Sequence, residues 1–436
     1  MKVLDKIRNI AFWTNDLLKG SVIRKNYIDI KNILENPDED HHKKILKLRL
    51  EKILEHASKN VAYYENTNVL KSNIHTFPVV NKNIIRDKID DFISNGIDKV
   101  SLHRVVTSGS TGTPFSVYHD AKKRNRNSAD TIYFGILAGF EIGTQLNYLK
   151  IWTKVNRKNR LQAWAENIIP IDVTQLSDEN IEKLLLNFAL NSTPKAFLGY
   201  ASALESICQF IEKKNYKIII KNVKSIIAMS EGLSDYGKHS LHKYFGVYPI
   251  SRYSNVENGI IAQQLPDGSN SFIVNWASYY IEILEIENNE PVELGKPGRI
   301  VVTDYFNYAM PIIRYDTGDI GVLDWDEKKK NIILKKVEGR KMDLVYNTEG
   351  NLVSSFTITN NMWLYPEIKQ YQFIQTGRTN YLFKLNLEGK FERELLLISE
   401  FKNYFGQDAD ISVDYVDEIP LLNSGKRKKV MNIYQN

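Results

Sequence analysis

The stretch HRVVTSGSTGTPFSVYH, residues 103–119, places a loop of hydroxyl and glycine residues between two short β-like runs. The flanking runs predict two strands joined as in a hairpin. A Walker-type phosphate loop precedes a helix and has a lysine before its last Ser or Thr, and neither condition is met here. Small donors and glycines still let backbone amides approach an anion closely, so the loop is either an anion cradle or an ordinary polar turn.

The hydrophobic pattern on either side of this stretch divides the chain into regions. Residues before about 100 are mostly helical, with an apolar stripe from Ile45 to Ala62. From about 120 to 250, helical segments alternate with short apolar runs, and from about 270 to 340 the period changes to two. We therefore expect an α/β protein with a large layered N-terminal domain, residues 1–339, that includes a β-rich subdomain. A small α+β C-terminal domain is expected at 340–436.

Composition and charge limit the classes of function. The 58 basic and 52 acidic residues give a formal net charge of +6, spread along the 436-residue chain. This suits an anionic ligand and argues against a nucleic-acid partner, which usually selects a clustered basic face. The single cysteine, Cys208, excludes an intramolecular disulfide and fits a reducing, cytoplasmic location. No apolar run is long enough to predict a stable membrane span.

The segment MKVLDKIRNIAFWTNDLLKG, residues 1–20, has apolar residues at helical spacing with Lys2, Lys6 and Arg8 between them. Thr14, Asn15 and Asp16 interrupt it, so it has no signal-peptide core. It predicts either a helix that lies on a membrane surface or a helix docked on its own domain. We expect the docked helix.

Further motifs follow the loop in a fixed order. These are MSEGLSD (229–235), SRYSNVENG (251–259), RYDTGD (314–319), VEGRKMD (337–343) and PLLNSGKRKK (420–429). The set resembles the adenylate-forming superfamily of acyl-CoA synthetases, adenylation domains and luciferases, from about residue 40 to the end. SGSTGTP, FLGYASAL (197–204), MPIIRYDTGD (310–319) and GRKMD make it most similar to the phenylacetate-CoA ligase branch and its CapK-like relatives in capsular polysaccharide biosynthesis.

The resemblance implies an AMP-forming carboxylate ligase. Such enzymes use ATP and Mg²⁺ to convert a small-molecule carboxylate into an acyl-adenylate, and then pass the acyl group to an acceptor thiol or amine. Coenzyme A is the expected acceptor, which would make the chain an acyl- or aryl-CoA ligase. The first alternative is an amide ligase of surface polysaccharide biosynthesis, and the second is a nucleotide-binding relative without turnover.

The resemblance also implies the residues that bind the nucleotide. They are Ser108, Gly109, Ser110, Thr111, Gly112, Thr113, Glu231, Gly232, Tyr253, Asn255, Asp319 and Arg340. The loop residues would cradle the β- and γ-phosphates, and Tyr253 would stack on adenine with Asn255 at its edge. Asp319 would accept hydrogen bonds from the ribose hydroxyls, because a carboxylate offers two acceptors side by side. Arg340 would also reach the ribose.

The remaining implied roles concern metal, catalysis and substrate. Glu257 would hold Mg²⁺, a cation that prefers oxygen ligands. Lys426 would be the catalytic lysine that bridges the substrate carboxylate and the α-phosphate. It would ride on a mobile C-terminal domain that turns about a hinge at Asp343. The acyl pocket would include Tyr200, Ala201 and Ser202.

Two positions depart from the family pattern. Ser254 replaces the usual glycine after the tyrosine, and Val256 replaces the usual threonine or serine before the glutamate. Val256 removes a hydroxyl that normally helps to hold the α-phosphate or metal, which bears on the rate of adenylation.

Overall fold

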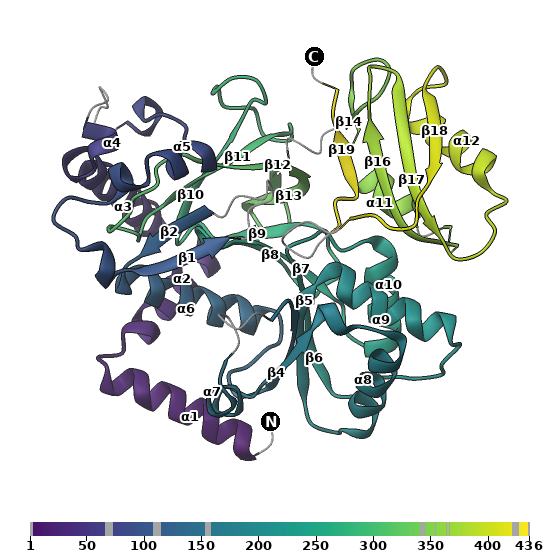
Figure 1. The fold of residues 1–436 in the computed structure, drawn as a ribbon. Coiled ribbons are helices and arrows are strands. Elements are labelled where there is room, and N and C mark those ends of the chain that lie inside the picture. Colours follow the sequence, from purple (N-terminus) through teal and green to yellow (C-terminus); the bar gives the residue numbers. More distant parts are fainter. Residues whose placement is uncertain are drawn as a thin grey trace.

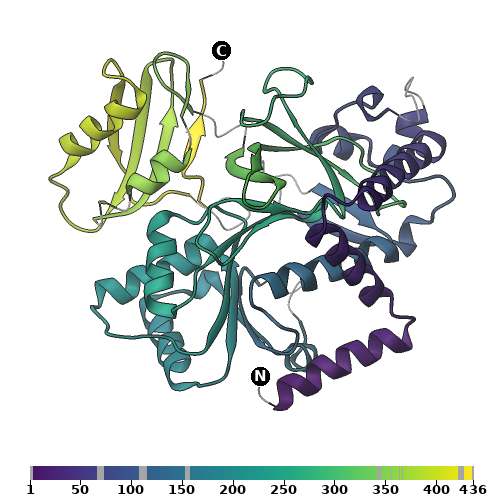
Figure 2. The same ribbon diagram turned by 180° about the vertical axis from the view of Figure 1, so that it is seen from behind.

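The computed structural model describes residues 3–65, 73–107, 115–152, 158–340, 345–353, 355–362, 364–365, 367–420 and 427–434. It has a large α/β part and a smaller α+β part with its own sheet (Figures 1 and 2). This confirms the predicted fold class. In the part of the chain that is described, no helix has the length and apolar character needed to cross a bilayer.

Helices dominate the first hundred residues. They are α1 (Val3–Leu18), α2 (Val22–Glu35), α3 (Asp40–Asn60), α4 (Ala62–Glu65) and α5 (Lys82–Asp87), with single 3₁₀ turns at Ile74–Thr76, Ile89–Phe92 and Lys99–Ser101. The Asn81 side chain accepts hydrogen bonds from the first amides of α5, which fixes where this helix begins. The strands β1 (His103–Thr107) and β2 (Phe115–His119) then pair antiparallel, with Thr107 opposite Phe115, as the hairpin prediction requires.

A single mixed sheet spans the large part. Within the described residues it contains eleven strands in the order β10-β11-β12-β13-β9-β8-β7-β6-β5-β3-β4. Their bounds are β3 (Gln145–Lys150), β4 (Ile168–Asp172), β5 (Lys195–Tyr200), β6 (Val223–Met229), β7 (Ile250–Asn255), β8 (Gly259–Gln264), β9 (Phe272–Val274), β10 (Tyr279–Leu284), β11 (Gly298–Asp304), β12 (Tyr315–Asp326) and β13 (Asn331–Arg340).

The strand β7 joins the two regions that the sequence pattern separates. It pairs parallel with β6 and antiparallel with β8. The alternating α/β region and the period-two region are therefore two halves of one sheet. The carboxyl end of β7, where the pairing changes direction, is a usual place for a ligand site in open α/β sheets.

Helices cover both faces of the parallel half. The helices are α6 (Ala121–Leu137), α7 (Arg160–Ala165), α8 (Asp178–Leu190), α9 (Ala201–Lys213) and α10 (Asp235–Phe245). In β6, Ile226 and Ala228 belong to the core beneath α8, α9 and α10, whereas Ile227 packs with Ala138 at the end of α6. Because neighbouring strand residues point to opposite faces, α6 lies on the other side of the sheet from α9.

The helix α1 contacts the large part through its polar side. Asp5 and Asp16 are buried, and the Asn9 side-chain amide donates to the Ile142 carbonyl at 3.2 Å. Gly143 has φ +97°, and a Cβ at this position would lie 2.2 Å from the Asp5 carbonyl oxygen. Only glycine permits this close approach of two backbones. The helix is thus docked on its own domain, but with the apolar stripe turned away from it.

The C-terminal part has a separate aromatic core. Its elements are β14 (Val345–Tyr346), β15 (Leu352–Val353), α11 (Ser355–Met362), β16 (Ile368–Gln375), β17 (Asn380–Leu387), α12 (Glu394–Phe405), β18 (Asp410–Tyr415) and β19 (Val430–Asn432). Four of the described strands form a sheet in the order β18-β17-β16-β19. Phe373 and Phe383 of this sheet pack against Phe401 and Phe405 of α12. This core draws only on residues after 344.

Candidate active site

Two of the predicted nucleotide-binding residues, Tyr253 and Asp319, are hydrogen-bonded to each other. The Tyr253 hydroxyl at the end of β7 donates to Asp319 Oδ2 at 2.8 Å and lies 3.1 Å from Thr317 Oγ1. The Thr317 hydroxyl donates to the Ile300 carbonyl at 3.0 Å, and accepts from the Asp319 amide at 3.2 Å. Burial, and then the Asp319 carboxylate, raise the pKa of Tyr253 well above its ordinary value. The phenol therefore stays protonated and acts as the donor.

The third residue of this group, Arg340, is brought in by strand pairing. β12 and β13 run antiparallel, and Asp319 faces Arg340 across the ladder. Two register shifts, between Ile320 and Gly321 and between Val322 and Leu323, set this alignment. Residues from three separate motifs, SRYSNVENG, RYDTGD and VEGRKMD, thus meet beside the carboxyl end of β7.

Glu257, the predicted metal ligand, lies in a buried polar cluster. The residue is 4% exposed, and its carboxylate accepts from the Tyr315 hydroxyl at 2.9 Å. Lys82 Nζ of α5 lies 3.7 Å from the same oxygen, Oε1. His119 Nε2 lies 2.8 Å from the Glu257 carbonyl oxygen. Burial lowers the pKa of His119 to about 4, so the ring is neutral near pH 7 and donates to this carbonyl.

This cluster suits a metal ion that takes only one or two of its ligands from the protein. Among the described residues there is no group of three or more His, Cys, Asp and Glu side chains able to hold a metal ion. Mg²⁺ usually keeps several waters and takes one or two carboxylates together with phosphate oxygens. A single buried carboxylate fits that mode of binding and does not fit an all-protein metal cage.

The cluster also includes residues that sequence reasoning missed. Tyr315 is the second residue of the RYDTGD motif, so its position in that motif could have marked it as a site residue. His119 follows the hydroxyl-rich loop directly through β2, which is a weaker signal. Lys82 has no marker in the sequence, because only the tertiary packing of α5 brings it to Glu257.

The predicted acyl-pocket residues form the start of α9. Tyr200 precedes the helix and makes no side-chain capping hydrogen bond, whereas the Ser202 amide donates to Glu231 Oε2 at 3.0 Å. The carboxylate of Glu231 thus caps the positive end of α9. Ala201 is buried, and Gly232 is exposed. The structure therefore joins the MSEGLSD and FLGYASAL motifs through this hydrogen bond and through the pairing of Tyr200 with Met229 in the β5–β6 ladder.

The C-terminal part reaches the same region through Lys429. Lys429 Nζ lies 5.7 Å from the centre of the Tyr371 ring. Tyr371, and then the carboxylates of Glu205 and Glu231, raise the pKa of Lys429 above its ordinary value. A direct contact between the two parts is the ion pair of Lys213 in α9 with Glu388, at 2.8 Å.

Several predicted site residues lie outside the described residues. These are Ser108, Gly109, Ser110, Thr111, Gly112, Thr113, Asp343 and Lys426. Their described neighbours are the facing ends of β1 and β2, Arg340 at the end of β13, and Arg427. Asn255 is described, and its side-chain oxygen accepts from the Asn258 amide at 2.8 Å, which closes the turn that contains Glu257.

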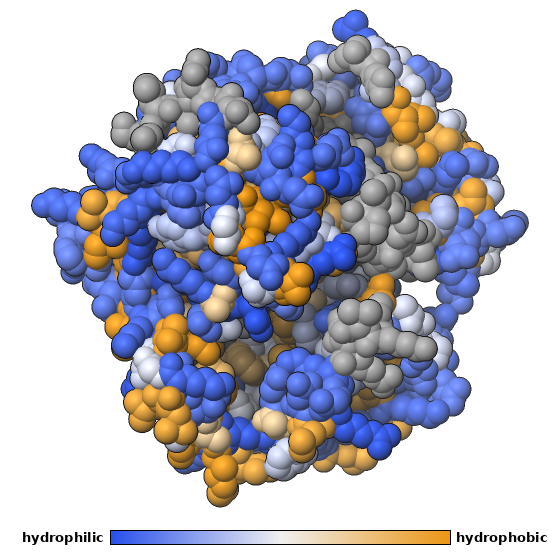
Figure 3. Space-filling view, turned by 60° about the vertical axis from the view of Figure 1, so that its left-hand side comes forward, coloured by the Kyte–Doolittle hydropathy of each residue, from blue (hydrophilic) through white to orange (hydrophobic). Residues whose placement is uncertain are grey.

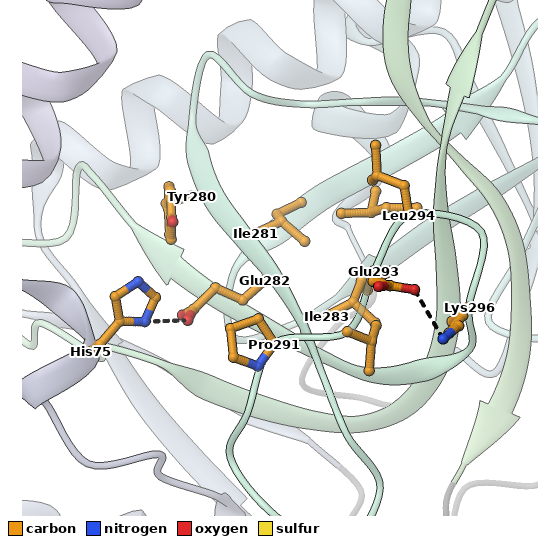
Figure 4. A pocket seen from close by; sticks show the side chains of 11 residues that line it. His75, Tyr280, Ile281, Glu282, Ile283, Pro291, Glu293, Leu294 and Lys296 are labelled. Carbon is orange, nitrogen blue, oxygen red and sulfur yellow. Dashed lines mark ion pairs between the residues drawn. The ribbon is translucent and has the colours of Figure 1, made fainter.

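A pocket of about 150 Å³ lies elsewhere, between His75 and the strand β10 (Figure 4). In it, His75 Nδ1 lies 3.6 Å from Glu282, and Lys296 lies 2.9 Å from Glu293. Glu282 is also paired with the buried Arg314 at 3.0 Å, which gives this carboxylate a structural role. None of the predicted site residues that the structure describes lines this pocket.

Known proteins resemble both parts of the chain. Residues 345–433 match the family model of the CapK C-terminal domain. No curated protein matches the chain. A solved 2-hydroxyisobutyryl-CoA ligase, in the postadenylation state in complex with R3-HIB-AMP, is 14% identical with a TM-score of 0.70, covering 92% of this chain and 91% of its own. The anthranilate CoA ligase AuaEII, in complex with anthranoyl-AMP, is 14% identical with a TM-score of 0.54, covering 77% and 68%.

The same 2-hydroxyisobutyryl-CoA ligase has been solved in other states. In the thioesterification state its TM-score falls to 0.58, although 93% of this chain and 92% of that chain are covered. The whole chain therefore superposes better on the postadenylation structure than on the thioesterification structure. The chain shares its fold with these acyl-CoA ligases, and its residues 345–433 match the CapK C-terminal domain.

Proposed function

We propose that the chain is an AMP-forming carboxylate ligase that uses Mg-ATP to activate a carboxylic acid and then transfers the acyl group to coenzyme A. The observation that carries the proposal is the meeting of Tyr253, Asp319 and Arg340 beside the buried carboxylate of Glu257. These residues come from motifs far apart in the sequence. The solved structures of similar fold support the proposal, because they include complexes with acyl-AMP, with ATP and with CoA.

The chain's residues would divide the work of adenylation. Tyr253 holds the Asp319 side chain in place, and a fixed carboxylate is well matched to the vicinal hydroxyls of a ribose. Glu257 would hold Mg²⁺, which would supply positive charge to offset the negative charge of the phosphates. Lys426, assigned from its motif, would stabilise the charge that develops when one anion attacks another. The loop of residues 108–113 would bind the leaving pyrophosphate.

The two parts of the chain would act as separate domains in the cytoplasm. Their boundary would lie at residues 339 and 340, with Asp343 as the hinge. The ion pair of Lys213 with Glu388 would break when the C-terminal domain turns toward the arrangement of the second half-reaction.

The acceptor distinguishes a second candidate function. The CapK C-terminal domain match favours a role in surface polysaccharide biosynthesis, in which an amine takes the acyl group. A third candidate is a nucleotide-binding relative that does not turn over. Val256, in place of the usual hydroxyl residue before Glu257, motivates this candidate.

The test is carboxylate-dependent exchange of labelled pyrophosphate into ATP over a broad panel of acids. Exchange with at least one acid, lost in Lys426→Ala and in Asp319→Ala, is the expected result. Release of AMP with coenzyme A or with amino sugars then identifies the acceptor. Tight ATP binding without exchange for any acid would favour the non-catalytic relative. Absence of ATP binding would refute nucleotide chemistry altogether.

A further inference from the structure

The helix α1 presents an apolar face to solvent. Its outward residues are Val3, Leu4, Ile7, Ile10, Leu17 and Leu18, which are 45% to 82% exposed. They are spaced three and four apart, so they form one stripe along the helix. A helix that stabilises a domain normally turns such a stripe inward. Here Asp5, Asn9 and Asp16 face the domain instead.

The orientation of α1 is built into the surrounding structure. Asp16 accepts hydrogen bonds from the amides of Ile23 and Arg24 at 2.9 Å, which fixes the turn into α2. Asn167 Nδ2 donates to the Gly143 carbonyl at 2.8 Å, beside the close contact between Gly143 and Asp5. These contacts hold the polar side of the helix against the domain. The apolar stripe is therefore displayed outward by specific interactions.

The short helix α7 extends the same surface. The Arg8 guanidinium donates to the Trp164 carbonyl at 3.1 Å and lies 5.5 Å from the Trp164 ring centre. Leu161 and Trp164 are 74% and 61% exposed. In Figure 3, hydrophobic residues gather along the lower edge of the molecule, the height at which Figure 1 places α1 and α7. We call this combined surface the α1–α7 face.

The exposed charge on the α1 part of this face is basic, whereas on α7 Arg160 is exposed and Glu166 is paired with Lys158. Between residues 3 and 25 the acidic residues are Asp5 and Asp16, and both are buried. The exposed charges there belong to Lys6, Lys19, Arg24 and Lys25. A two-fold contact between two copies would set these like charges against each other. An anionic bilayer surface complements both the charge and the apolar stripe, and exposed tryptophan is common at that boundary.

We propose that the α1–α7 face docks the protein on an anionic membrane surface. The apolar stripe enters the boundary between head groups and acyl chains, and the lysines and arginines contact anionic head groups. Nothing in this mode of binding requires a membrane span. It is also independent of the proposed ligase activity.

The test uses the full chain and flotation with two kinds of vesicle. One kind contains equal parts of phosphatidylglycerol and phosphatidylcholine, and the other contains phosphatidylcholine alone. The protein is expected to float with the anionic vesicles, less so at high salt. The double variant Ile7→Asp/Ile10→Asp is expected to lose at least about tenfold in partitioning, because two apolar side chains no longer enter the bilayer. Lys6→Glu/Lys19→Glu is expected to weaken binding to the anionic vesicles.

The matched control is Leu395→Asp, at an 82% exposed leucine of α12 in the C-terminal part, which is expected to bind as the unchanged protein does. Circular dichroism checks that each variant is folded. No flotation, or flotation that survives Ile7→Asp/Ile10→Asp, would overturn the proposal. Equal binding to both kinds of vesicle would overturn its anionic part. Light scattering that shows a dimer dissociated by the same variant, without vesicle binding, would assign the face to a second copy.

Discussion

Replacing Tyr253 by phenylalanine tests whether the Tyr253–Asp319 hydrogen bond prepares a ribose site. The change removes the hydroxyl that lies 2.8 Å from Asp319 Oδ2 and leaves the ring in place. Because this bond already exists before the nucleotide binds, its loss affects the free and the bound protein alike. In the variant, nucleotide binding must also order the Asp319 side chain, which costs about 0.5–1.5 kcal/mol of binding free energy. The dissociation constant for Mg-ATP should rise roughly two- to tenfold.

Replacing Asp319 itself by alanine should cost more. That change removes the acceptor of the ribose hydroxyls, and hydrogen bonds to a charged group contribute about 1.5–3 kcal/mol each. ATP binding should therefore weaken by roughly tenfold or more. In the Asp319→Ala background, Tyr253→Phe should have no further effect, because the hydroxyl has no carboxylate left to orient.

Isothermal titration calorimetry with a non-hydrolysable ATP analogue and Mg²⁺ measures all four proteins of this double-mutant cycle. Tyr248→Phe, which removes the hydroxyl of a half-exposed ring, is the control for the chemical change alone. A penalty for Tyr253→Phe that is the same with and without Asp319 would refute the orienting role. So would wild-type affinity in Asp319→Ala.

Three other predictions follow from single contacts. Glu257→Gln should lower Mg²⁺-dependent pyrophosphate exchange about 100-fold or more, because the metal loses its charged ligand. The melting temperature should barely change, since an amide oxygen still accepts from Tyr315. Unchanged exchange would show that Glu257 is not a metal ligand. The pKa of His119 falls to about 4 when it is buried in the fold, against about 6.5 in the unfolded chain. Its contribution to stability is therefore complete above about pH 6.5 and is lost toward pH 4, by about 3 kcal/mol; denaturant unfolding of His119→Gln should show a correspondingly weaker loss, and parallel pH curves would contradict the assignment. Gly143→Ala should displace α1 and speed its proteolysis, because the new Cβ would lie 2.2 Å from the Asp5 carbonyl. Gly20→Ala, with similar φ but open space around it, is the control and should not expose the helix.

The elements of the fold were largely predictable from the sequence because their periodicity is local. The hairpin around residues 103–119, the alternating helices and strands, and the period-two strands after residue 270 all occur in the structure. That β7 unites them into one sheet was not predictable, because strand pairing is a long-range choice. The orientation of α1 was not predictable either, since periodicity defines an apolar face without saying what covers it.

The site shows the same limit. Motif order suggested that Asp319 and Arg340 act together, and the pairing of β12 with β13 places them opposite each other. Counting residues from the turn between β12 and β13 does not predict that Asp319 pairs with Arg340, because two register shifts lie between the turn and this pair. Lys82 reaches Glu257 only through the packing of α5, and no property of its own segment marks it. The roles of these residues, and those of Lys426 and Asp343, stay predictions.

The carboxylate of Glu231 belongs to two parts of the molecule at once. It holds the first turn of α9 through the Ser202 amide, and it contributes to the field that favours charged Lys429 in the C-terminal part. Any rotation that withdraws Lys429 changes the electrostatic environment of the residues that begin α9. If the C-terminal part rotates as proposed, its position would therefore alter the electric field at Tyr200, Ala201 and Ser202, the residues predicted to belong to the acyl pocket.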